Sequence, residues 1–125
     1  MSKLRVVGAV IALGDQVLLA QRAPGGAHGG LWEFPGGKVE AGEDDPSALT
    51  RELQEEMDVQ AEISELIGVG EDSLVQLWCY RCTLLGEPKA LEHSELRWFS
   101  ISKVRAEMMP PADHPALRAL QASRL

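Results

Sequence analysis

An acidic stretch, RELQEEMDV at residues 51–59, is the clearest candidate for chemistry in this chain. Four of its nine residues are Glu or Asp: Glu52, Glu55, Glu56 and Asp58. Like charges this close repel by a few tenths of a kcal/mol per exposed pair on a helix. A hard divalent cation such as Mg²⁺ or Mn²⁺ offsets the repulsion, because it binds carboxylate oxygens and bridges to phosphate oxygens. The stretch therefore indicates a metal site that serves a polyphosphate compound.

The residues around this stretch predict a helix over 46–57. Its apolar side chains recur at four-residue spacing, at Leu49, Leu53 and Met57. Asp45 suits the N-cap position and Pro46 the first helical position, so the beginning of the helix is well defined.

This helix gathers three glutamates on one side. At about 100° per residue, Glu52, Glu55 and Glu56 fall in one stripe that borders the apolar face. A solvated charged face typically carries mixed signs and lies opposite the apolar face, so the pattern fits it poorly. Arg51 precedes Glu55 by four residues and can pair with it. We interpret the helix as a cation-binding platform.

The same residues carry a resemblance to a known family. The chain is similar to the Nudix box, G-x5-E-x7-R-E-U-x-E-E-x-G-U with U aliphatic, across residues 37–59. The specified positions are matched by Gly37, Glu43, Arg51, Glu52, Glu55 and Glu56, and the aliphatic ones by Leu53 and Val59. Six fixed matches arise by chance with a probability on the order of 10⁻⁷ per starting position. Asp58 replaces the glycine of the box, and we expect it to end the helix, since Asp tolerates φ > 0.

Outside the box the chain resembles the MutT-like branch of this family. The resemblance rests on LWEFPGGK at 31–38, on PPAD at 110–113, on Arg22 and on Glu92. It implies a nucleotide pocket formed by Arg22, Glu33, Phe34, Pro35, Gly36, Lys38 and Asp113. It implies metal ligation by the Gly37 carbonyl with Glu52, Glu55, Glu56 and Glu92. Glu52, paired with Arg51, is the first choice of general base, and Glu55 or Glu92 are alternatives.

The order of predicted elements indicates an α/β fold in a single domain over 1–125. Strands are expected at 4–13, 16–22, 59–69, 73–85 and 95–100, with a terminal helix at 114–123. Strands on both sides of a central helix suggest a mixed β-sheet between α-helices, and the Nudix fold has this α/β/α arrangement.

Several residues have simpler structural interpretations. Trp32 suits the core as well as a pocket, and Asp113 suits the N-cap of the last helix. His28, His93 and His114 are predicted to be incidental. Cys79 and Cys82 lie three residues apart on a predicted strand, so their thiols point to opposite faces and neither a redox pair nor a zinc site is expected.

Composition narrows the choice of partner. The net charge of −7 and the pI near 4.9 argue against binding of DNA or RNA polymers, which requires Lys and Arg to neutralise phosphates. The apolar run VVGAVIAL is far shorter than a membrane span, and no secretory signal is visible. A cytoplasmic protein is expected, with a monomer as the default state.

Together these features predict a Mg²⁺-dependent nucleoside triphosphate pyrophosphohydrolase that removes unwanted nucleotides, with Mn²⁺ as a substitute cation. A deprotonated Asp113 can accept a hydrogen bond from the exocyclic amino group of cytosine. A protonated Asp113 can instead donate a hydrogen bond to an oxidised purine, as in 8-oxo-dGTP. Two alternatives stay open. One is a Nudix hydrolase of a nucleotide sugar or a dinucleoside polyphosphate, and the other is a non-catalytic nucleotide-binding Nudix domain.

Overall fold

The computed structural model describes residues 2–91 and 95–123, so Glu92 and His93 lie outside the described residues. The strands are β1 (Leu4–Val10), β2 (Ala12–Leu13), β3 (Gln16–Gln21), β4 (Trp32–Glu33), β5 (Gly36–Lys38), β6 (Ala61–Glu71), β7 (Val75–Leu84) and β8 (Glu95–Ser100). The helices are α1 (Asp45–Met57) and α2 (His114–Ala122), with short 3₁₀ turns at Ile101–Lys103, Ala106–Met108 and Pro111–Asp113. Within the described part of the chain, neither helix is long and apolar enough to cross a bilayer.

The strands form two sheets. The first has the order β5-β1-β7-β6, in which β1 runs parallel to β7 and antiparallel to β5. In the second, β3 pairs antiparallel with β2, β4 and β8. The predicted strand over 4–13 is in fact two strands, because the chain leaves the first sheet at Ile11 and enters the second at Ala12. An almost continuous apolar run hides this change, because the exposed Leu13 of β2 is as apolar as the buried residues of β1.

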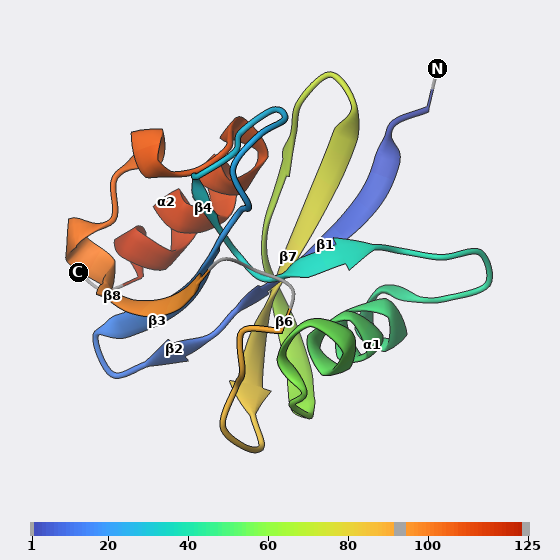
Figure 1. Cartoon of the computed structure of the whole chain (residues 1–125), viewed down its shortest axis with the longest axis horizontal. Coiled ribbons are helices and arrows are strands. Elements are labelled where there is room, and N and C mark those ends of the chain that lie inside the picture. Colours follow the sequence, from blue (N-terminus) through green and yellow to red (C-terminus); the bar gives the residue numbers. More distant parts are fainter. Residues whose placement is uncertain (1, 92–94, 124–125) are drawn as a thin grey trace.

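The helices cover opposite sides of the molecule, and each closes its own hydrophobic cluster (Figure 1). The α1 cluster contains Val7, Ala9, Leu49 and Leu53, and the α2 cluster contains Val10, Leu77, Leu117 and Leu120. Alternate residues of β1 serve the two clusters, as the period of two in a strand requires. The predicted α/β fold, with β-sheet between α-helices, is confirmed.

The two cysteines are free and buried on opposite sides of β7, as the strand period predicts. Cys79 belongs to the α2 cluster and Cys82 to the α1 cluster. Burial raises the pKa of Cys82 to about 12 and that of Cys79 well above its ordinary value. Both thiols are therefore protonated core residues at neutral pH.

Helix α1 begins one residue earlier than predicted. Its N-cap is Asp44, whose Oδ1 accepts a hydrogen bond from the Ser47 backbone N–H at 2.8 Å. The prediction of Asp45 as N-cap is wrong, because the Asp45 carboxylate is engaged by Arg5 of β1. The other end is as predicted: Asp58 has φ 49° and ψ 48°, the left-handed conformation that ends a helix.

Candidate active site

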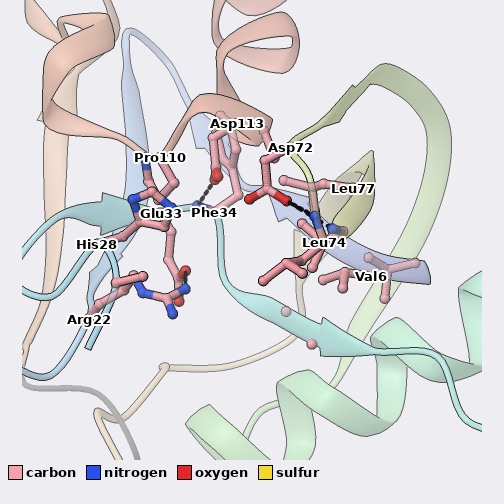
Figure 2. Close-up of a pocket in the computed structure, with 16 residues that line it drawn as sticks. Val6, Arg22, His28, Glu33, Phe34, Asp72, Leu74, Leu77, Pro110 and Asp113 are labelled. Atoms are coloured by element: carbon pink, nitrogen blue, oxygen red, sulfur yellow. Dashed lines mark hydrogen bonds and ion pairs between the residues drawn. The ribbon is translucent and has the colours of Figure 1, made fainter. Parts of the chain in front are cut away.

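A pocket of about 290 Å³ lies between the first sheet, strand β4 and the segment that precedes α2 (Figure 2). Five of the predicted substrate-binding residues line it: Arg22, Glu33, Phe34, Gly36 and Asp113. Its volume is near the lower end of the range for small-molecule sites. The pocket thus unites Arg22, which follows β3, with residues of the β4–β5 segment and of the PPAD segment, three parts of the chain that are far apart in the sequence.

Asp113 is the most buried acid of the pocket, with only 4% of its surface exposed. Its Oδ2 accepts a hydrogen bond from the Phe34 backbone N–H at 3.0 Å (Figure 2). Burial raises the pKa of Asp113 to about 8, and this effect outweighs the lowering by the Phe34 N–H. The residue occupies the N-cap position of α2 but makes no cap hydrogen bond, so the capping role is wrong. Its carboxyl group faces the pocket instead and is neutral at pH 7.

Arg22 and Glu33 form a polar pair on another wall. Arg22 Nη1 donates to Glu33 Oε1 at 2.8 Å, and both side chains are partly exposed. Antiparallel pairing of β3 with β4 sets this contact, since Ala20 lies opposite Glu33 in the register. The pair supplies both donors and acceptors to a ligand in the pocket.

Arg51 organises the carboxylates of the box. Its guanidinium donates to both Glu43 oxygens at 2.7 and 2.9 Å, to Glu52 at 3.0 Å and to Glu55 at 3.2 Å. A further bond reaches the Lys38 carbonyl at 3.0 Å. The hydrogen bond from Arg51 lowers the pKa of Glu43 to about 2, so this carboxylate is charged at neutral pH. The predicted pairing of Arg51 with Glu55 is therefore present within α1, and the bond to the Lys38 carbonyl ties α1 to β5.

Gly37 connects the pocket to the carboxylate stripe. It lines the pocket, and the Glu52 carboxyl group occupies the space that a Cβ at this position would need. In Figure 2, strand β5 passes between the pocket residues and α1. A ligand that extends from the pocket past Gly37 therefore meets the glutamates of α1.

The donor set suits a hard cation. Glu52 is partly exposed and Glu56 is 9% exposed, so these two lie at the edge of the core as predicted, whereas Glu55 is open to solvent. Over residues 2–91 and 95–123, no three His, Cys, Asp or Glu side chains lie close enough to hold a metal ion. Arg51 holds Glu52 and Glu55 in this arrangement. Carboxylate oxygens beside the Gly37 backbone are nonetheless the ligand types that Mg²⁺ takes, so the chemistry of the donor set, rather than its present spacing, fits the cation.

Not every predicted pocket residue lines the pocket. Pro35 is fully buried beneath it, and the exposed Lys38 lies outside it. His28, predicted to be incidental, does line it, and so does Asp72 of the β6–β7 turn. Sequence reasoning missed Asp72 because a Gly-Glu-Asp turn between two strands has an ordinary structural explanation. Only the pairing of the sheets places it at the pocket.

Comparison with known proteins identifies the family. The NUDIX domain profile matches residues 2–120. The chain belongs to the NUDIX domain family. It is 36% identical to the CTP pyrophosphohydrolase of Escherichia coli, over 99% of this chain and 96% of the relative. It is 32% identical to the 8-oxo-dGTP diphosphatase of the same species, over 97% and 98% of the two chains.

The fold is shared with solved Nudix structures. A MutT NUDIX hydrolase from Burkholderia pseudomallei superposes with a TM-score of 0.83 at 27% identity, over 96% of this chain and 99% of that one. The predicted resemblance to MutT-like Nudix proteins is confirmed. The chain is a Nudix hydrolase, an enzyme of the class that cleaves phosphoanhydride bonds, generally with divalent cations.

Proposed function

We propose that this Nudix hydrolase converts nucleoside triphosphates to the monophosphate and pyrophosphate with Mg²⁺, for which Mn²⁺ substitutes. The observation that carries the proposal is the position of Gly37, which lines the base-sized pocket and touches the Glu52 carboxyl group. A nucleotide whose base occupies the pocket extends its phosphates across this glycine. The two relatives described above are named for triphosphate substrates, which supports the same class.

The residues of the box have distinct roles in this reaction. Glu52, Glu55, Glu56 and the Gly37 carbonyl hold the cation, with Glu92 as a further predicted ligand. The cation would supply the positive charge that neutralises the polyphosphate and stabilises the charge on the leaving group. Glu52 accepts the proton of the attacking water. Arg51 orients the Glu52 carboxylate through a hydrogen bond of 3.0 Å. Glu55 and Glu92 stay as alternative bases.

Burial of Asp113 favours a guanine-type base at neutral pH. One of its oxygens accepts from the Phe34 N–H, and the other carries the proton and can donate to a base carbonyl. Guanine presents such a carbonyl in both its ordinary and its oxidised form, so guanine nucleotides are the first candidates, and 8-oxo-dGTP comes first among them because the 32% identical relative is named for it. Cytidine nucleotides are the second, because a deprotonated Asp113 accepts from the cytosine amino group and the 36% identical relative is named for CTP.

A panel assay of pyrophosphate release tests the proposal. The substrates are CTP, dCTP, 5-methyl-dCTP, dGTP and 8-oxo-dGTP, each with Mg²⁺ and with EDTA. A UDP-sugar and a dinucleoside tetraphosphate are included with their nucleotide products measured by chromatography, because their hydrolysis releases no pyrophosphate. We expect pyrophosphate from at least one triphosphate in Mg²⁺ only. Turnover of the sugar or dinucleotide alone supports the other Nudix activity, and binding without turnover supports a non-catalytic domain.

Substitution of the glutamates tests their assignment. Glu52→Gln and Glu56→Gln keep the side-chain size but remove the charge that a cation needs. We expect both variants to lose turnover at saturating Mg²⁺. Near wild-type turnover in either variant would show that the substituted glutamate is not required at the site. A monomeric state and a cytoplasmic location stay predictions that gel filtration and fractionation can test.

A further inference from the structure

A second polar network lies at the N-terminal end of α1, about two turns before the box glutamates. Asp45, the first residue of α1, has only 7% of its surface exposed. Arg5 of β1 donates to it through Nε at 2.8 Å and Nη2 at 2.7 Å, and the Tyr80 hydroxyl of β7 donates to its Oδ2. We call Arg5, Asp45 and Tyr80 the Asp45 network. It joins three elements that are separated by at least 35 residues of chain.

The network is held in a fixed geometry. The Arg5 guanidinium lies 4.1 Å above the centre of the Trp78 ring, which supports its planar face while its two N–H groups meet the carboxylate. The hydrogen bond from Arg5 lowers the pKa of Asp45, and burial raises the pKa of Tyr80 to about 12. Asp45 is therefore charged and Tyr80 neutral over the physiological range, so the contact persists.

Capping of the helix does not account for Asp45. The adjacent Asp44 already caps α1 through the Ser47 N–H. If Asp45 only interacted with the helix dipole, its carboxylate would be expected to stay in solvent, where it loses no hydration energy. A buried carboxylate with a two-bond partner on another element acts between elements instead.

The same strand also holds the other half of the metal site. Val7 of β1 lies opposite Gly37 of β5, and the Arg5 carbonyl accepts a hydrogen bond from the Val39 N–H at 3.0 Å. Arg5 thus holds the chain next to Gly37 with its backbone and the first turn of α1 with its side chain. The Glu52 carboxyl group, two turns further along α1, lies against Gly37.

We propose that the Asp45 network positions α1 against β1 and β5, and thereby sets the spacing between the Gly37 carbonyl and the α1 glutamates. Arg5, Asp45 and Tyr80 are positioning residues for the cation site. The inference rests on the proposed function of those glutamates. It adds a group of residues outside the box on which metal affinity depends.

Metal binding to the nucleotide-free protein tests the inference. Arg5→Lys keeps the charge but loses the two-bond geometry, and Tyr80→Phe removes a single hydroxyl. We expect calorimetry to show Mn²⁺ binding weakened about tenfold in Arg5→Lys, the lower end of the loss for an outer-shell partner, and by less in Tyr80→Phe. The Mg²⁺ concentration for half-maximal turnover should rise in the same order, and turnover at saturating Mg²⁺ should recover most of its value.

Asp44→Ala is the matched control, because it removes the N-cap of the same helix without touching the Asp45 network. We expect a lower unfolding temperature in Asp44→Ala but a Mn²⁺ affinity within about twofold of wild type. If the control weakens Mn²⁺ binding as much as Arg5→Lys does, helix stability alone explains the effect and the inference is overturned. Unchanged affinity in both Arg5→Lys and Tyr80→Phe overturns it as well, and if Arg5→Lys does not fold, Tyr80→Phe decides.

The two proposals fail in different ways. Wild-type protein that binds no Mn²⁺ and hydrolyses no nucleotide contradicts the proposed function, and the positioning role with it. Wild-type protein that binds Mn²⁺ and turns over substrate, beside network variants that match wild type, contradicts only the positioning role.

Discussion

Asp113 accepts a hydrogen bond from the Phe34 backbone N–H at 3.0 Å although 79 positions separate the two residues. The bond joins the segment before α2 to the residue that follows β4, and both residues line the pocket. It occupies one carboxyl oxygen and leaves the other for a ligand. The protonation of Asp113 therefore affects both the stability of the fold and the choice of base.

The raised pKa of Asp113 predicts a pH-dependent stability. Between about pH 4 and pH 8 the folded state keeps a proton that the unfolded state has released, so the free energy of unfolding falls as pH rises. The contribution is complete below pH 4 and is lost as pH passes 8, with a limiting slope of about 1.4 kcal/mol per pH unit for one proton. Urea denaturation of wild type and Asp113→Asn at pH 5, 6, 7 and 8 measures it. Parallel curves for the two proteins would contradict the assigned pKa.

Loss of Arg51 should reduce activity more than stability. Arg51→Gln releases Glu52 and Glu55 and breaks the bond to the Lys38 carbonyl. We expect kcat/KM to fall about 10- to 100-fold, the usual loss when a residue that orients metal ligands is removed. Arg81→Gln is the control, because Arg81 pairs with the exposed Glu65 and should leave kcat/KM unchanged. Equal kcat/KM in the two variants would show that Arg51 does not contribute to the site.

Addition of one methyl group at Gly37 should disable the site. A Cβ there takes the space of the Glu52 carboxyl group, so Gly37→Ala must displace that side chain. We expect turnover to fall about 100-fold, as a displacement near 1 Å can cost, with about 1–3 kcal/mol lost in stability. Gly86→Ala is the control, because its added Cβ meets only Val59 Cγ2 at 3.6 Å. Steady-state kinetics and thermal unfolding compare the two; wild-type turnover in Gly37→Ala would refute the contact.

Restoration of the box glycine should change little. In Asp58→Gly the left-handed conformation, φ 49°, becomes free of strain, but the 2.9 Å hydrogen bond from Gln54 Nε2 is lost. These effects oppose each other, and we expect the free energy of unfolding to change by less than about 1 kcal/mol. Activity should equal that of wild type, since Asp58 ends the helix and lies outside the carboxylate stripe. A changed kcat would show that Asp58 takes part in chemistry.

Local patterns predicted α1 well. Its limits differ from the structure by one residue, and its glutamates lie at the edge of the apolar face as the period of 3.6 requires. The choice of cap failed because Asp44 and Asp45 are equivalent in local propensity. Arg5 of β1, forty residues away, binds the Asp45 carboxylate, and Asp44 caps the helix instead.

The sequence by itself determined the carboxylate stripe, the C-terminal end of α1 and the resemblance to the family, because these depend on residues within one helix or one motif. Only the tertiary structure decided that Gly37 touches Glu52, that Asp113 faces Phe34 with a raised pKa, and that Asp72 and His28 reach the pocket. These relationships arise from strand pairing and burial between distant segments. The spacing of residues along the chain does not predict which strands pair or which side chains become buried.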